Sequence, residues 1–164
     1  SGMFAFANKF NHDISGWNVD KVQDMSQMFS GAEAFNQDIS SWYVSRVTNM
    51  SGMFAFANKF NHDISGWNVS KVRDMSFMFL GAKAFNQDIS SWNVSRVTDM
   101  SHMFKFAIQF NQNLSGWDVR NVINFNKIFE GSGLSSIDTR SLNNAEDLTP
   151  EERRSAWEKL KWPE

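Results

Sequence analysis

The sequence predicts an α/β solenoid of about six stacked 25-residue turns, each a short helix followed by a short strand, with a helix closing the C-terminal end. Two observations predict this fold class. A 25-residue frame recurs without a gap, and inside each copy the spacing of apolar residues changes from helical to strand-like. Neither half of such a unit buries its apolar side alone, so successive units must stack.

The frame reads S-x-M-F-x-x-A-x-x-F-N-x-(D/N)-(I/L)-S-x-W-x-V-x-x-V-x-x-(M/F), and all nine methionines fall in two of its positions. The first and third copies differ at only two positions, which indicates that a 50-residue pair was duplicated. We number the positions of the frame 1–25, starting at Ser1. The predicted repeat domain, 1–142, consists of the copies 1–25, 26–50, 51–75, 76–100 and 101–125 and a degenerate sixth copy, 126–142.

The first half of each repeat is predicted to be a helix of about two to three turns. Phe4, Ala7 and Phe10 lie on one side of such a helix, and Asp24 or Ser26 is a candidate N-cap for the next one. In the second half, the W-x-V segment has the alternation of a very short strand, because residues two apart point the same way. Equivalent strands should then lie side by side, about 4.8 Å apart.

The chain after the repeats, 143–164, is predicted to be a capping segment. Thr149 and Glu152 have the spacing of a capping box, and Pro150 suits the first helical position. We therefore expect a helix over about 150–160. The N-terminal turn has no comparable lid.

Composition excludes several classes of function. Sixteen basic and 18 acidic side chains give a net charge of −2, so the chain lacks the basic excess expected of a nucleic-acid partner or an anionic lipid surface. There is no cysteine, and no apolar run approaches the roughly 18 residues of a membrane span. Most polar residues recur in files rather than converging on one point, so we expect no enzyme, no catalytic residue, no metal and no cofactor.

The segment from Ile39 to Met50 has the L-x-x-L-x-L spacing of a leucine-rich repeat, with Trp42 and Val44 in two of the leucine places. The longer pattern V-S-x-V-T-x-M-S-x-M-F-x-x-A-x-x-F-N-x-D-I-S-x-W resembles the 25-residue BspA-like leucine-rich repeat of bacterial surface proteins, which is abundant in mycoplasma surface lipoproteins. The resemblance covers 1–142. It implies a leucine-rich-repeat-like solenoid at the cell surface or secreted, associated with adhesion and protein binding, with any signal sequence upstream of this segment.

The candidate binding surface is the outward side of the predicted strands, a choice that rests on the resemblance, because leucine-rich repeats commonly bind through that face. A basic file beside hydroxyl and amide files suits an acidic or sugar-bearing partner, although a charge row is more often a solvated face. Tyr43 is the only tyrosine and the best single anchor. The predicted partner-binding residues are Tyr43, Arg46, Asn68, Lys71, Asn93 and Arg96.

Other files have structural interpretations. The asparagines at position 11 are expected to bond the turn backbone and the neighbouring repeat, and the aspartates at position 13 to cap turns rather than hold calcium. His12 and His62 should lie about 10 Å apart, too far to share a zinc ion. Phe6, Phe56 and Phe106 alternate with glycines along the stack, so each ring either drapes over a glycine or joins an exposed aromatic row.

The sequence thus favours a non-catalytic adhesion module that binds a protein or glycan on another surface. The alternative is a structural spacer that sets length without binding. Self-association through the open N-terminal turn is compatible with both hypotheses.

Overall fold

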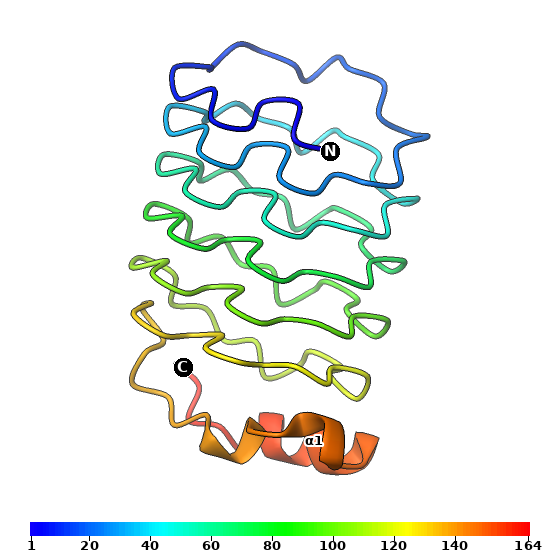
Figure 1. Ribbon diagram of the computed structural model, residues 1–164, viewed down its shortest axis with the longest axis vertical. Coiled ribbons are helices and arrows are strands. Elements are labelled where there is room, and N and C mark those ends of the chain that lie inside the picture. Colours follow the sequence, from blue (N-terminus) through cyan, green and yellow to red (C-terminus); the bar gives the residue numbers. More distant parts are fainter.

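The computed structural model describes all 164 residues as one stack of 25-residue turns, with the N-terminus at one end and helix α1 (Pro150–Glu158) at the other (Figure 1). Two 3-10 helices, η1 (Arg140–Leu142) and η2 (Ala145–Asp147), precede α1. No helix is long and apolar enough to cross a membrane.

The predicted α/β solenoid of helix-plus-strand turns is wrong. Residues 1–139 form tight turns and no helix, and the only sheet-like pairing is a column of isolated parallel bridges, one residue wide. The bridges join equivalent residues of successive repeats: Asp24 to Asn49, Asn49 to Asp74, Asp74 to Asp99 and Asp99 to Asn124. The leucine-rich-repeat-like sheet implied by the resemblance is therefore absent.

The predicted helix fails because alternate backbone groups bond outside their own repeat. The N–H of Gln27 donates to the C=O of Ser51 at 2.8 Å, and that of Phe29 donates to Met53 at 2.9 Å. The intervening N–H groups donate instead to the C=O group three residues earlier in the chain. The φ angles of Gln27 and Gly31 are 55° and 71°, values that a right-handed helix does not contain.

Positive φ angles recur at the second and sixth positions of all six repeats. These residues are Gly2, Phe6, Gln27, Gly31, Gly52, Phe56, Phe77, Gly81, His102, Phe106, Lys127 and Gly131. Each is the third residue of a tight turn or the neighbour of such a turn. A type II turn requires a positive φ angle at its third residue. The apolar spacing that predicted a helix therefore belongs to a chain of turns, and Asp24 caps such a turn by accepting the N–H of Ser26 at 2.8 Å.

The predicted strand fails for a different reason. The N–H of Trp17 bonds to the C=O of Ile14 and that of Val22 to Val19, each at 3.0 Å, so this segment is folded into turns. Side chains link the repeats here instead of a backbone ladder. The indole N–H of Trp42 donates to the C=O of Ile14 in the preceding repeat at 3.1 Å. Trp67, Trp92 and Trp117 repeat this bond at 3.0–3.2 Å.

The interior is a continuous cluster of 46 buried apolar residues that runs the length of the stack. The phenylalanines at positions 4 and 10 form two columns. Phe54 stacks on Phe79 with ring centroids 5.7 Å apart, and on Phe60 of its own repeat at 4.2 Å. Burial of each such side chain contributes about 1.5–3 kcal/mol, and the column gains more from each repeat stacked on it.

The capping helix α1 runs from Pro150 to Glu158, two residues shorter than the expected 150–160, and begins with a complete capping box. The N–H of Glu152 donates to Thr149 Oγ1 at 3.1 Å, and Glu152 Oε1 accepts the N–H of Thr149 at 3.0 Å. Trp157 closes the core: its indole donates to the C=O of Leu114 at 2.8 Å and its ring lies parallel to that of Trp117. It supplies the tryptophan that the sixth repeat lacks.

Candidate binding surface

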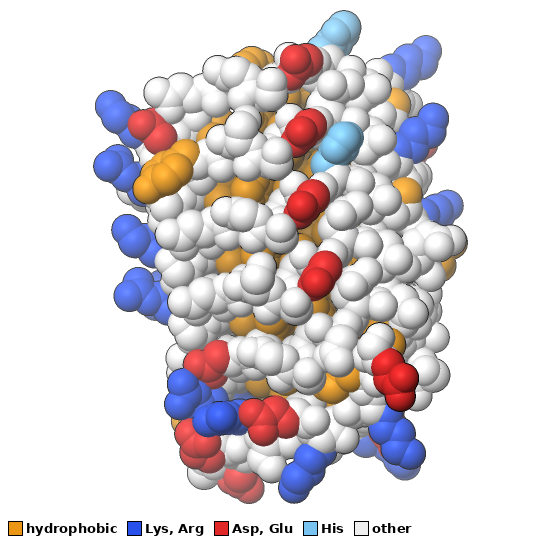
Figure 2. Space-filling model, turned by 180° about the vertical axis from the view of Figure 1, so that it is seen from behind, with side chains coloured by type: hydrophobic (Ala, Val, Ile, Leu, Met, Phe, Trp, Pro, Cys, Tyr) orange, Lys and Arg blue, Asp and Glu red, His pale blue; other side chains and the backbone are white.

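We call the six predicted partner-binding residues the Tyr43 surface. All six are exposed, and they belong to three consecutive repeats. Its members are Tyr43, Arg46, Asn68, Lys71, Asn93 and Arg96. Arg46, Lys71 and Arg96 lie in turns, and Tyr43, Asn68 and Asn93 lie in the irregular segments just before those turns, not on strands. In Figure 2, a column of Lys and Arg side chains projects from one edge of the molecule.

Rigid turns hold the cations of this surface. The N–H of Val47 donates to the C=O of Val44 at 3.0 Å, and both valines are at most 2% exposed. Arg46 is the third residue of that turn, so its side chain projects from a corner anchored on both sides by the core. Lys71 and Arg96 occupy the same place in the next two repeats. The structure therefore aligns these cations along the stack.

The two asparagines also have a structural role, which the sequence interpretation missed. Asn68 Oδ1 accepts the N–H of Ser70, and Asn93 Oδ1 accepts that of Ser95, each at 3.1 Å. Their amide nitrogens make no hydrogen bond within the protein. Tyr43 occupies the equivalent position without capping its turn, and its side chain is 65% exposed.

We call Lys21, Arg46, Lys71 and Arg96 the cationic column. None of the four forms an ion pair or a side-chain hydrogen bond, so their charges face only solvent. In the fifth repeat Asn121 ends the column, donating to the C=O of Ser95 at 2.7 Å.

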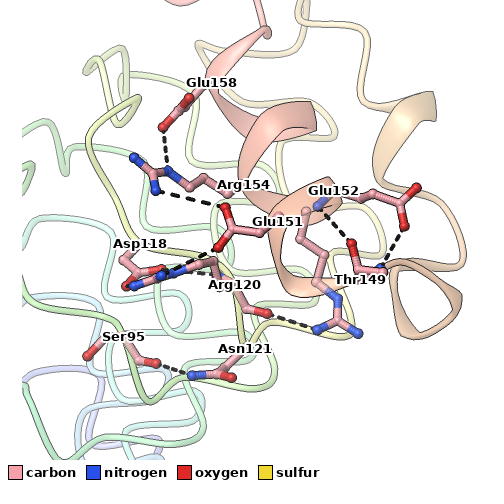
Figure 3. Close-up of polar contacts among 10 residues, drawn as sticks. Ser95, Asp118, Arg120, Asn121, Thr149, Glu151, Glu152, Arg154 and Glu158 are labelled. Carbon is pink, nitrogen blue, oxygen red and sulfur yellow. Dashed lines mark hydrogen bonds and ion pairs between the residues drawn. The ribbon is translucent and has the colours of Figure 1, made fainter.

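The next arginine along the stack has neutralising partners (Figure 3). Arg120 makes two hydrogen bonds to the carboxylate of Asp118, the shorter at 2.7 Å, and lies 3.6 Å from Glu151 of α1. The hydrogen bond from Arg120 is the main cause of the lowered pKa of Asp118. Arg120 is therefore neutralised by carboxylates, whereas the cations of the cationic column are not.

The aspartates at position 13 cap turns. Asp38 Oδ1 accepts the N–H of Ser40 at 2.9 Å, and Asp63 Oδ1 accepts that of Ser65 at the same distance. The hydroxyl and backbone N–H of each serine lower the pKa of the carboxyl group. Figure 2 shows a column of acidic side chains along the stack. Nowhere do three or more carboxylate or imidazole groups converge.

The structural interpretation of the asparagine file is confirmed. Asn11 Oδ1 accepts the N–H of Asn36 in the next repeat at 2.9 Å, and the side chain of Gln37 donates to the same oxygen at 3.0 Å. Later repeats continue this ladder. His62 takes the glutamine's place, with Nε2 2.9 Å from the C=O of Asn36. These residues bind the repeats to one another.

Both interpretations of the position-6 phenylalanines hold in part. A Cβ atom added to Gly31 would lie 2.9 Å from Cδ1 of Phe6, so the ring does drape over the glycine of the next repeat. The rings of Phe6, Phe56 and Phe106 are nevertheless 81%, 47% and 48% exposed. Phe56 also borders an open groove of about 450 Å³.

A crevice of about 680 Å³ lies between residues 123–126 and residues 142–146, the segment that contains the end of η1 and the start of η2. Its polar lining consists of four asparagines and Glu146, its one ionisable residue. No sequence pattern indicated this crevice, because it depends on how the tail packs.

The family described as "Mycoplasma protein of unknown function, DUF285" matches the chain twice, over residues 1–79 and 62–149. Two overlapping matches are the pattern expected of a tandem-repeat family. The prediction that the chain consists of tandem repeats is therefore confirmed. No curated protein and no solved structure matches the chain.

Proposed function

The chain belongs to the DUF285 family of Mycoplasma proteins, and from this premise we propose that it is a non-catalytic binding or adhesion module of a cell-surface or secreted protein. It binds a protein or glycan of another surface through the Tyr43 surface. The resemblance of its frame to the BspA-like repeats of bacterial surface proteins supports this location and role.

The observation that carries the proposal is that an exposed aromatic side chain and several unpaired cations lie together on one rigid edge. Tyr43 directly precedes the turn that carries Arg46, and Lys71 and Arg96 continue the charge along the stack. Aromatic and arginine side chains dominate the binding energy of many interfaces. Because core valines already fix these turns, binding requires little further ordering of the backbone.

The test is binding of the labelled protein to the surface of cultured host cells. A variant with Tyr43, Arg46, Lys71 and Arg96 changed together to serine should lose at least nine-tenths of the bound protein without a lower melting temperature. The matched control changes Lys9, Lys59 and Lys83 to serine, three exposed cations outside the surface. Equal binding by the quadruple variant and the wild type would overturn the proposal.

The second candidate is a structural spacer that self-associates through its N-terminal turn. The observation in its favour is the apolar surface of the first repeat: Phe4 and Phe10 are only half-buried, and Trp17 is 44% exposed. Sedimentation over a wide range of concentrations tests it. Strictly monomeric behaviour would rule out the self-association.

A further inference from the structure

The cationic column has a geometry that a compact ligand does not match. Four cations project from equivalent turns of four successive repeats, so they form a column with one charge per repeat (Figure 2). Equivalent rings of neighbouring repeats lie 5.7 Å apart in the core and paired backbones about 4.8 Å apart, so the column is about 14–17 Å long. A small anion contacts one or two of these charges, whereas a linear polyanion parallel to the stack reaches all of them.

Neutral polar groups run beside the charges. Ser45, Ser70 and Ser95 immediately precede the cations, and none of their hydroxyl groups makes a hydrogen bond within the protein. The amide nitrogens of Asn68 and Asn93 are unpaired as well. Hydroxyl and amide groups both donate and accept hydrogen bonds, which suits a ligand rich in hydroxyl groups.

Within the proposed function, which this inference presupposes, we propose that the ligand is a linear sulfated or carboxylated polysaccharide lying along the cationic column. One sugar unit of an extended chain advances by about the rise of one repeat, so successive acidic groups meet successive cations. The serine hydroxyls and asparagine amides then face the sugar hydroxyls. Tyr43 offers an aromatic face for one sugar ring at the second repeat.

The charge distribution favours a polysaccharide over a nucleic acid. The chain carries a net charge of −2, and a column of aspartates runs along the same stack. Nucleic-acid binding takes most of its free energy from phosphate contacts with a broad basic surface. A single line of cations with hydroxyl and amide groups beside it matches a slender sugar chain better.

The experiment measures binding of the full chain to immobilised heparin and chondroitin sulfate, with neutral dextran as the uncharged probe. We expect binding to one or both sulfated polymers, none to dextran, and an affinity that falls steeply with salt, because each cation engaged releases counterions. A heparin hexasaccharide should bind at least tenfold more tightly than a disaccharide. Equal affinity for the two lengths would contradict a column-wide site.

The matched variants locate the site. R46E/K71E/R96E should weaken heparin binding at least tenfold, and K9E/K59E/K83E, with the same change in net charge, should change it less than threefold. Equal losses in both variants would refute a defined site. Single-stranded DNA that competes as well as heparin at equal charge would refute the preference for sugar.

The outcome also separates this inference from the proposed function. If host-cell binding depends on the Tyr43 surface but neither sulfated polymer binds, the polysaccharide assignment is wrong and the adhesion proposal stands. If the polymers bind through the column but cell binding ignores it, the adhesion proposal fails on its own test.

Discussion

Replacing Gly81 with alanine tests the way in which neighbouring repeats fit together. Gly81 has a φ angle of 64°, and a Cβ atom there would lie 2.5 Å from Cδ1 of Phe56. An L-residue at such a φ angle costs about 1–2 kcal/mol. Inserting a methyl group into an occupied space costs about 1–3 kcal/mol more, toward the lower end here because the half-exposed ring can swing outward.

We therefore expect Gly81→Ala to lower the free energy of unfolding by about 2–4 kcal/mol. For a chain of this length the melting temperature should fall by about 5–15 °C. The assay is urea and thermal unfolding followed by tryptophan fluorescence. Gly66→Ala is the control, because nothing lies within 4 Å of its Cβ position and its φ angle is not in the left-handed region. It should change stability by less than about 1 kcal/mol.

A double-mutant cycle separates the two contributions. In a Phe56→Ala background the ring is gone, so Gly81→Ala should cost only the backbone part, about 1–2 kcal/mol. Gly81→Ala without any loss of stability would refute the reasoning. A full-sized loss in the Phe56→Ala background would show that the ring contact contributes nothing.

Three further predictions concern the columns. Trp67→Phe should lower the free energy of unfolding by about 1–3 kcal/mol, because it leaves the C=O of Ile39 without its indole donor. Trp17→Phe removes no such bond and should cost less than about 1 kcal/mol. Equal losses of the two variants in urea unfolding would contradict a stabilising role of the indole bonds between repeats. Trp157→Ala should cost about 3–5 kcal/mol and speed hydrogen exchange in the last repeat first, and exchange that rises uniformly would refute the capping role. The pKa of Asp38 is lower in the folded than in the unfolded chain, so its stabilisation is present above pH about 4 and is lost as the pH falls below that value. Changing Asp38 and Asp63 together to asparagine should make the melting temperature less dependent on pH between pH 5 and pH 2.5. An unchanged pH profile would show that these two carboxylates do not contribute to acid sensitivity.

The stacking positions were predictable from the sequence, but the backbone conformation was not. Side chains such as Phe54 and Val69 are buried wherever the frame repeats them, because a repeat stacked on its own copy must bury the same positions. The spacing of Phe4, Ala7 and Phe10 fits a helix and also fits a chain of tight turns. Only the glycines at positions such as Gly31 indicated the turns, since a glycine inside a short helix is unfavourable.

The exposure of the candidate surface was predictable in the same way, because Arg46 and Lys71 lie between anchored valine positions. The capping role of Asn68 was not, since it depends on a turn that replaced the expected strand. The link between repeats made by the indole of Trp42 also lay beyond pattern reasoning. A sequence pattern identifies such a tryptophan only as a large apolar side chain in the core. The partner of its indole N–H is known only from the structure.

The alternation of phenylalanine and glycine at position 6 limits how the gene could have grown or shrunk. Loss of one unit, for example 26–50, would place Phe56 directly after Phe6, where the space under the ring admits no side chain. Loss of two adjacent units leaves every ring over a glycine. Unequal recombination should therefore be tolerated in steps of 50 residues, and natural length variants should differ by an even number of turns.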